Sequence, residues 1–94
     1  MITGPQIRAA RALLGIDQKT LAQMAGLSVP TIQRMEASGG VVGGMVDSLT
    51  RVIAAIEGAG VELIAEGATS MASGRGVRLW RPDGPVSGGD GEGE

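Results

Sequence analysis

Apolar residues recur at helical spacing in four stretches of the first sixty residues. In the first stretch, Ile7, Ala10 and Leu14 fall on one face of a helix. Thr3 and Gln6 have the spacing of a capping box, in which two side chains bond backbone N–H groups at the start of a helix. The pattern therefore predicts a first helix that begins at Thr3 and ends at the glycine after Leu14.

The second stretch predicts a short helix. Asp17 is its expected N-cap, because a carboxylate accepts backbone N–H groups and suits the positive end of the helix dipole. The predicted inner face consists of Leu21, Met24 and Ala25. Gly26 is the expected C-terminal stop.

The third stretch has a proline near its start. We predict a helix from Ser28 or Val29 to about Ala37, so that Pro30 lies in the first turn. The missing N–H of a proline costs little there, because that group has no helical partner in any case. If Ser28 is the cap, its hydroxyl can accept only the N–H of Thr31.

The glycine-rich loop "ASGGVVGG" separates this helix from a fourth, predicted from about Val46 to Gly58. Residues 1–60 are therefore expected to form one small helical domain. The core-facing positions predicted for the fourth helix are Val46, Leu49, Val52, Ile53 and Ile56.

The pattern changes after residue 60. "VELIAE" and "GVRLWR" are short and rich in branched residues, so we predict a β-hairpin over residues 61–82. Glutamates of one strand and arginines of the other could form cross-strand ion pairs. Residues 83–94 are acidic and rich in proline and glycine, and are predicted to form a disordered tail.

The composition removes several classes of function. The chain has no cysteine and no histidine, and Trp80 is its only aromatic residue. Disulfides, thiol chemistry and sites built on histidine are therefore excluded. The chain also lacks a membrane-length apolar run and the blocks of a secretory signal, so we expect a cytoplasmic protein. We expect no metal, no cofactor and no enzyme, because no cluster of Asp, Glu, Lys or Ser marks a catalytic cleft.

The charge distribution leaves nucleic-acid binding open. The net charge is −2, but residues 83–94 hold four acidic residues and no base. Residues 1–36 carry four basic residues against two acidic ones, a local balance of +2. Local charge matters more than total charge for a surface that faces phosphates. A balance this small predicts that helix termini and backbone amides share the phosphate contacts.

Two short helices joined by a tight turn with a glycine form a helix-turn-helix, a common DNA-binding unit. Ala22 is small where the two helices would cross. Ile32 and Met35 would anchor the second of these helices on the core. The alternative is an ordinary helical hairpin in a small bundle.

The outer face of the third helix favours DNA binding. Pro30, Arg34 and Ala37 lie opposite the core, and Gln33 and Thr31 flank them. In the major groove, arginine can bind guanine and glutamine can bind adenine through two hydrogen bonds each, and apolar side chains suit a thymine methyl group. The alternative is that these polar side chains merely face solvent.

Glu36 falls on the inner face of the third helix, where a buried carboxylate needs a partner. Arg11 on the first helix is the natural candidate. Such an ion pair would tie the third helix to the first and fix its angle. The alternative is that both side chains reach solvent at the edge of the domain.

The segment "IRAARALLGIDQKTLAQMAGLSVPTIQRMEAS" resembles the helix-turn-helix of the Cro/cI phage-repressor type, also called the xenobiotic-response-element (XRE) family. The resemblance implies a mostly α, lambda-repressor-like bundle, here of about four helices followed by the β-hairpin. It covers about residues 4–57 and rests on Arg11, Leu14–Gly15, Asp17–Gln18, Leu21–Ala22, Gly26, Ser28, Ile32 and Glu36.

The same resemblance implies roles for single residues. Gln18 would bond a phosphate, Thr31 would lie near the DNA backbone, and positions 29, 30 and 34 would face bases. It also implies the ion pair of Arg11 with Glu36. The chain departs from the family in having apolar residues at positions 29 and 30 and no basic residue in the loop after the third helix. The full set expected to contact DNA is Gln18, Lys19, Ser28, Val29, Pro30, Thr31, Gln33 and Arg34.

Proteins of this fold usually bind DNA as dimers on pseudo-palindromic sites. We expect the C-terminal hairpin to form a homodimer, although its apolar residues could instead complete the core of their own chain. The expected function is a sequence-specific transcription regulator, more readily a repressor than an activator. The alternative is an antitoxin that binds a partner toxin and autoregulates its operon. The candidate interface residues are Leu63, Val77, Leu79 and Trp80.

Overall fold

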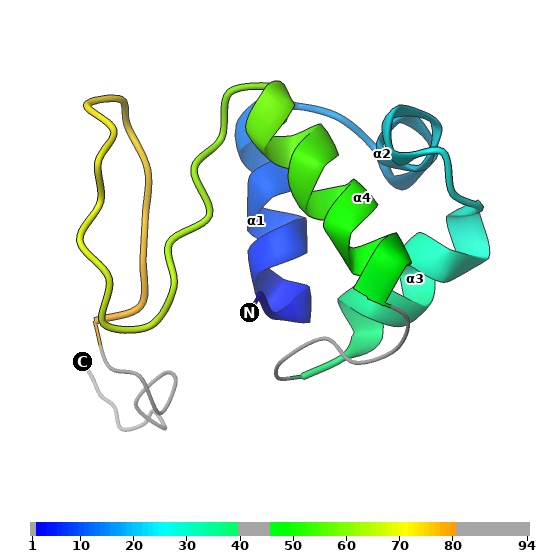
Figure 1. Cartoon of the computed structure of the whole chain (residues 1–94), viewed down its shortest axis with the longest axis horizontal. Helices are drawn as coiled ribbons and strands as arrows, with labels where there is room; N and C mark the ends of the chain where they lie inside the picture. Colours follow the sequence, from blue (N-terminus) through cyan, green and yellow to red (C-terminus); the bar gives the residue numbers. More distant parts are fainter. Residues whose placement is uncertain (1, 40–45, 81–94) are drawn as a thin grey trace, which may run out of the picture.

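The computed structural model describes residues 2–39 and 46–80. Four helices occur in these ranges, and Figure 1 shows them gathered into one bundle. Their bounds confirm the four helices predicted from the apolar pattern. The predicted acidic tail, residues 83–94, and most of the predicted glycine-rich loop lie outside the described residues. The helices are α1 (Gly4–Leu14), α2 (Gln18–Ala25), α3 (Val29–Ala37) and α4 (Val46–Gly58).

Local capping sets the start and end of α1. The Thr3 hydroxyl accepts the backbone N–H of Gln6 at 3.2 Å, and the Gln6 amide oxygen accepts that of Thr3 at 2.8 Å. This confirms the predicted capping box. Gly15 ends the helix with a φ of 69°, a left-handed conformation that glycine adopts without a steric cost.

The core lies where the four helices meet. α2 packs against α3 and α4, and α1 packs against α3. Two residues predicted to face the core do not: Met24 is 43% exposed and Val46 is 75% exposed. The inward stripe of α2 consists of Leu21, Ala22 and Ala25, and Val46 is the first residue of its helix. The largest fully buried side chains are Ile7, Leu21, Ile32, Val52 and Ile56.

Residues 61–80, here called the arm, run along the side of the bundle away from α3 (Figure 1). Val61 and Leu63 pack against the core, and the Gln6 amide donates to the Ile64 carbonyl at 2.9 Å. The arm is exposed from residue 65 onward. It therefore depends on a few contacts near its start.

The predicted β-hairpin is wrong for the described residues of this segment, because no strand forms in the arm. Charged side chains of the two predicted strands instead bond backbone groups of the loop between them. The Glu62 carboxylate accepts the N–H of Met71 at 2.8 Å, and Arg78 donates to the Ala68 carbonyl at 2.6 Å. Cross-strand pairing of these two charged residues is consequently not observed. A two-stranded hairpin without a covered apolar face is only marginally stable.

No helix among the described residues is long and apolar enough to cross a membrane. In the same residues, no group of three or more acidic side chains is placed to hold a metal ion.

Candidate nucleic-acid interface

The turn between α2 and α3 sets the direction of the exposed helix. Gly26 ends α2 in the left-handed conformation, with a φ of 69°. Ser28 caps α3, and its hydroxyl accepts the N–H of Thr31 at 3.3 Å. Of the two starts predicted for this helix, Ser28 as the cap is therefore confirmed, and Pro30 lies in the first turn without breaking it.

The two faces of α3 differ sharply. Ile32 and Met35 are buried, whereas Gln33 and Arg34 are exposed together with Pro30. Within residues 2–39 and 46–80, the Gln33 and Arg34 side chains make no hydrogen bond or ion pair with another part of the chain. Their donors and acceptors are therefore available to a ligand outside the molecule.

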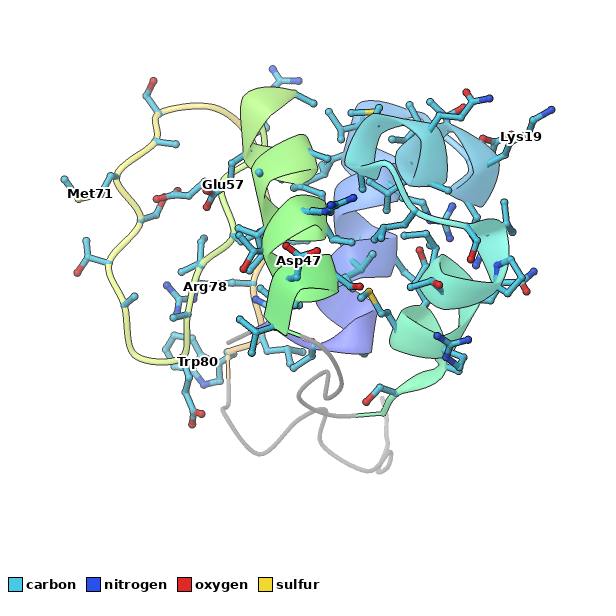
Figure 2. All side chains as sticks on the ribbon, turned by 45° about the vertical axis from the view of Figure 1, so that its right-hand side comes forward. Lys19, Asp47, Glu57, Met71, Arg78 and Trp80 are labelled. Atoms are coloured by element: carbon cyan, nitrogen blue, oxygen red, sulfur yellow. The ribbon has the colours of Figure 1, made fainter. Side chains whose placement is uncertain are left out.

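The remaining predicted contacts surround this exposed face. Val29 and Thr31 are partly buried, and the Thr31 hydroxyl lies 2.9 Å from that of Ser28. Lys19 is exposed on α2, at the opposite side of the molecule from the arm (Figure 2). Gln18, the first residue of α2, is partly buried.

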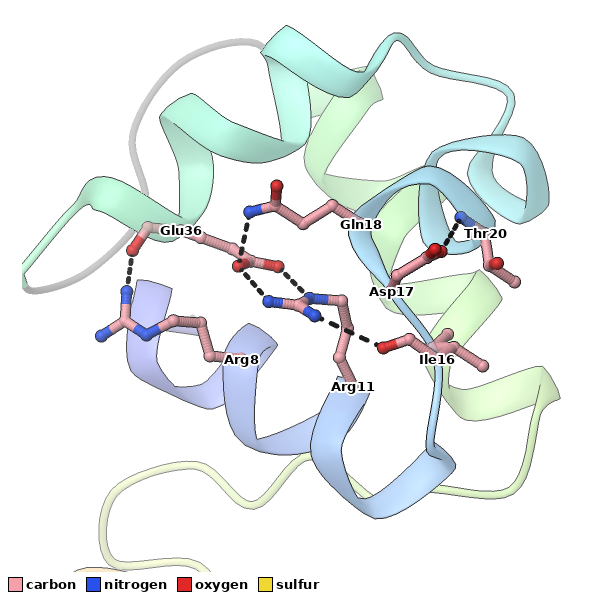
Figure 3. Close-up of polar contacts among 7 residues, drawn as sticks. All are labelled: Arg8, Arg11, Ile16, Asp17, Gln18, Thr20 and Glu36. Carbon is pink, nitrogen blue, oxygen red and sulfur yellow. Dashed lines mark hydrogen bonds and ion pairs between the residues drawn. The ribbon is translucent and has the colours of Figure 1, made fainter.

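A buried carboxylate joins three helices beneath this face. Glu36 of α3 is 3% exposed. Arg11 of α1 donates to it from Nε at 2.6 Å and from Nη2 at 2.7 Å. Gln18 of α2 donates from Nε2 at 3.0 Å, so the carboxylate has three donors (Figure 3). The structure thus brings together two residues predicted to pair and one predicted to contact phosphate.

The charge state of Glu36 follows from these contacts. Burial alone would raise the pKa of its carboxyl group. The hydrogen bonds from Arg11 and Gln18, with the positive charges of Arg11 and Arg8, outweigh burial and lower that pKa below its ordinary value. Glu36 is therefore ionised at neutral pH.

Gln18 has a second amide hydrogen besides the one given to Glu36. A neutral amide nitrogen donates two hydrogen bonds. The free N–H can serve a phosphate while the other holds the side chain in place. The Asp17 carboxylate caps α2 by accepting the N–H of Thr20 at 2.8 Å, and this bond lowers the Asp17 pKa. The first two N–H groups of α2 precede that bond and remain open to an anion.

Sequence reasoning missed the contact between the start of α1 and the end of α3. A side-chain carbon added at Gly4 would lie 2.7 Å from the Glu36 carbonyl oxygen and 2.9 Å from that of Met35, and would also meet the Ser38 carbonyl. Arg8 donates to the same Glu36 carbonyl. The sequence signal was weak: Gly4 is a poor helix former placed inside a predicted helix.

Arg51 of α4 was also missed. Its Nη1 donates to the Gly26 carbonyl at 3.4 Å, directly at the turn before α3. Its Nε lies 3.1 Å from an Asp47 carboxylate oxygen, and both of these side chains are largely exposed. The spacing of Asp47 and Arg51, four residues apart on a helix, predicts the ion pair but not the contact with the turn.

The candidate dimer residues lie apart from this site, on the arm. Leu63 is partly buried and packs against the core of its own chain. Val77 and Leu79 are exposed, and Trp80 is exposed at the last described position of the arm (Figure 2). Three of the four side chains are therefore accessible to a partner.

A comparison with protein families places this geometry in context. A family model described as helix-turn-helix matches residues 7–40. The match starts in α1 and includes α2, the turn and α3, which are the elements joined by the buried carboxylate. No curated protein matches the chain.

Proposed function

Because residues 7–40 form a helix-turn-helix of the Cro/cI (XRE) type, a DNA-binding unit of transcription regulators, we propose that the protein is a sequence-specific transcriptional repressor. It acts as a homodimer on a pseudo-palindromic operator. The observation that carries the proposal is the exposed face of α3, where Gln33 and Arg34 have no partner among the described residues.

The exposed face divides into base readers and phosphate contacts. Arg34 can bind guanine O6 and N7, and Gln33 can bind adenine N6 and N7. Val29 and Pro30 offer apolar contact to a thymine methyl group. Because the two positions at the start of α3 are apolar, Arg34 and Gln33 carry the hydrogen-bonded recognition.

Phosphate contacts surround these readers. Gln18 and Lys19 at the start of α2, with the hydroxyls of Ser28 and Thr31, are assigned to the DNA backbone. The Glu36 carboxylate supports this division, since it binds Gln18 and belongs to the reading helix. One buried group therefore sets the phosphate contact and the reading angle together.

The dimer follows from the size of the site. A single α3 reads only a few base pairs, and dimers of this fold read two half-sites about 34–36 Å apart. Bound at a promoter, such a dimer excludes other proteins from the same DNA, which is why we infer repression. A reporter gene behind the operator, measured with and without the protein, tests the sign of regulation.

Binding is tested by titrating labelled DNA from the protein's own promoter at several salt concentrations. Lys19 gives each dimer two exposed cations assigned to phosphates, so the logarithm of affinity should fall against that of salt with a slope of about −2. A flat salt dependence together with no preference over random DNA would contradict the proposal.

Arg34→Ala tests base recognition within this scheme. We expect a loss of about 1–3 kcal/mol on the operator and relaxed preference at one base position in each half-site. Arg75→Ala removes the same charge from the arm and serves as the control, with little change in sequence preference. Lys19→Ala should weaken all sequences alike. Uniform weakening by Arg34→Ala would make Arg34 a phosphate contact.

A second function is favoured by the exposed apolar side chains of the arm. They give an antitoxin a surface for a partner toxin, while the helix-turn-helix autoregulates the operon. Co-purification with the product of an adjacent gene, lost on Leu79→Asp but retained on Arg34→Ala, would support this alternative.

A further inference from the structure

An apolar groove lies between α1 and the arm, away from α3. It has a volume of about 660 Å³. Leu13 of α1 is 52% exposed in it, and Val77, Leu79 and Trp80 of the arm are 81%, 63% and 89% exposed. Large apolar side chains gathered around one groove mark a surface that binds another molecule.

The two segments of the arm that were predicted as strands are also not paired with each other. Among the described residues, no backbone hydrogen bond joins residues 61–66 to residues 76–80. Both segments nevertheless have the branched residues typical of strands. An extended segment that has no neighbouring strand can pair with a strand of another chain.

We propose that the arm pairs with the arm of a second copy of this chain, so that each copy covers the other's groove. The strand pairing expected within one chain is then made between two. This inference rests on the proposed homodimer and deepens it, because it names the segments that pair and their register.

The register follows from the apolar residues. In an antiparallel pair that sets Leu63 opposite Val77 of the second copy, Val61 lies opposite Leu79. All four of these side chains line the groove. Pairing in this register therefore buries apolar side chains of both copies against α1.

Charge favours the same register and a second copy as the partner. It sets Glu62 opposite Arg78 of the other chain, whereas pairing residues 61–66 with their own equivalents brings like charges together. In the single chain, Glu62 and Arg78 instead bond groups of their own arm. The arm therefore carries both the acidic and the basic residue that the pairing of two copies requires. Two-fold symmetry pairs residues 61–66 of each copy with residues 76–80 of the other, so both segments of each arm are paired.

Cross-linking tests the register directly, because the chain has no cysteine. Leu63→Cys and Val77→Cys are produced together and oxidised mildly, and each is also oxidised alone. Directly opposed residues have Cβ atoms about 4.5–5.5 Å apart, close to the reach of a disulfide. We expect a covalent dimer in the mixture and not in either variant alone. Met24→Cys with Val77→Cys is the control, since Met24 is exposed on α2. No cross-link in the mixture, or an equal yield in one variant alone, overturns the pairing.

Sedimentation tests the surface independently. Leu79→Asp should weaken self-association at least tenfold and leave the helical circular dichroism unchanged, because Leu79 is mostly exposed. Met71→Asp is the matched control: Met71 is 87% exposed but does not line the groove. Emission of Trp80, the only tryptophan, should shift to the blue as wild-type concentration rises. A wild-type monomer, or equal effects of both variants, overturns the inference.

The outcomes separate this inference from the proposed function. A dimer that binds the operator without the cross-link defeats the pairing and leaves the regulator in place. A cross-linked dimer without operator preference defeats the regulator and leaves the pairing in place. An adjacent-gene product that covers the groove of a monomer supports the antitoxin alternative and overturns the second copy as occupant.

Discussion

Removing Arg11 should damage this protein more than any other single charge change at the helix-turn-helix. Arg11→Met keeps the apolar stem of the side chain but takes two donors from Glu36, which is 3% exposed. The Ile16 carbonyl also loses a donor at 3.3 Å. The carboxylate then keeps only Gln18 as a direct partner.

The size of the loss follows from burial. Breaking a buried ion pair by removing one partner costs about 3–5 kcal/mol, because the other charge stays buried and unpaired. Arg11 is 20% exposed and Gln18 remains, so we expect the lower end of this range, about 3 kcal/mol. For a domain of this size, that loss lowers the melting temperature by roughly 12–24 °C.

Urea unfolding followed by far-ultraviolet circular dichroism measures the loss. Trp80 fluorescence is a poor probe here, because that side chain is 89% exposed in the arm. Glu36→Gln should cost less, about 1–3 kcal/mol, since Arg11 can turn its charge toward solvent. The double variant should lose less than the sum of the two by about 1 kcal/mol or more. Asp47→Asn, which breaks an exposed ion pair, is the control and should cost less than about 1 kcal/mol.

The dependence of the unfolding free energy on pH gives a second measurement on the Glu36 carboxylate. The folded-state pKa of Glu36 is lowered, so its contribution to stability is complete above its ordinary value of 4.5 and is lost as pH falls through the lowered pKa. Glu36→Gln should therefore flatten the fall in unfolding free energy below pH 4.5. Strictly additive losses in the double variant, or an unchanged acid profile, would refute the reasoning.

Three further perturbations test other contacts. Gly4→Ala should cost about 1–3 kcal/mol in urea unfolding, because its Cβ would lie 2.7 and 2.9 Å from carbonyl oxygens of α3; wild-type stability would show that the two helices can separate freely. Ser28→Ala should cost about 1 kcal/mol by loss of the cap of α3, and Ser28→Gly only a few tenths, so equal costs would contradict the capping role. Glu62→Gln should speed hydrogen exchange at the amides of Met71 and Ala72, which donate to that carboxylate. Lowering the pH should reduce the protection of these amides relative to their intrinsic exchange rates: bonds from Ser70 and these amides lower the Glu62 pKa, so protection is lost as pH falls through that lowered pKa. If neither the Glu62→Gln substitution nor the lower pH changes the protection of these amides, Glu62 does not order the arm.

The candidate site was only partly accessible from the sequence. The helical spacing of residues in α3 predicted which side chains face away from the core, since that depends only on the period of the helix. The bond from Gln18 to Glu36 joins residues 18 positions apart, and no local pattern encodes it. Arg51 of α4 reaches the turn although it lies 25 positions from Gly26 in the sequence. Packing alone decides such contacts.

The sequence by itself located the four helices, and for α1 to α3 it contains the residues that cap or stop them. Caps such as Thr3, Asp17 and Ser28 act on backbone groups within one turn, and Gly15 and Gly26 stop helices through their own conformation. These choices need no distant partner.

Only the tertiary structure decided the close approach at Gly4 and the fate of residues 61–80. Branched residues in the arm predicted strands, but a strand also needs a neighbour to bond and a face to cover. In the single chain, Glu62 and Arg78 bond backbone groups of the arm, and the apolar side chains of its second half stay exposed. Strand formation depends on long-range partners, and that is why local pattern located the helices correctly and misjudged the arm.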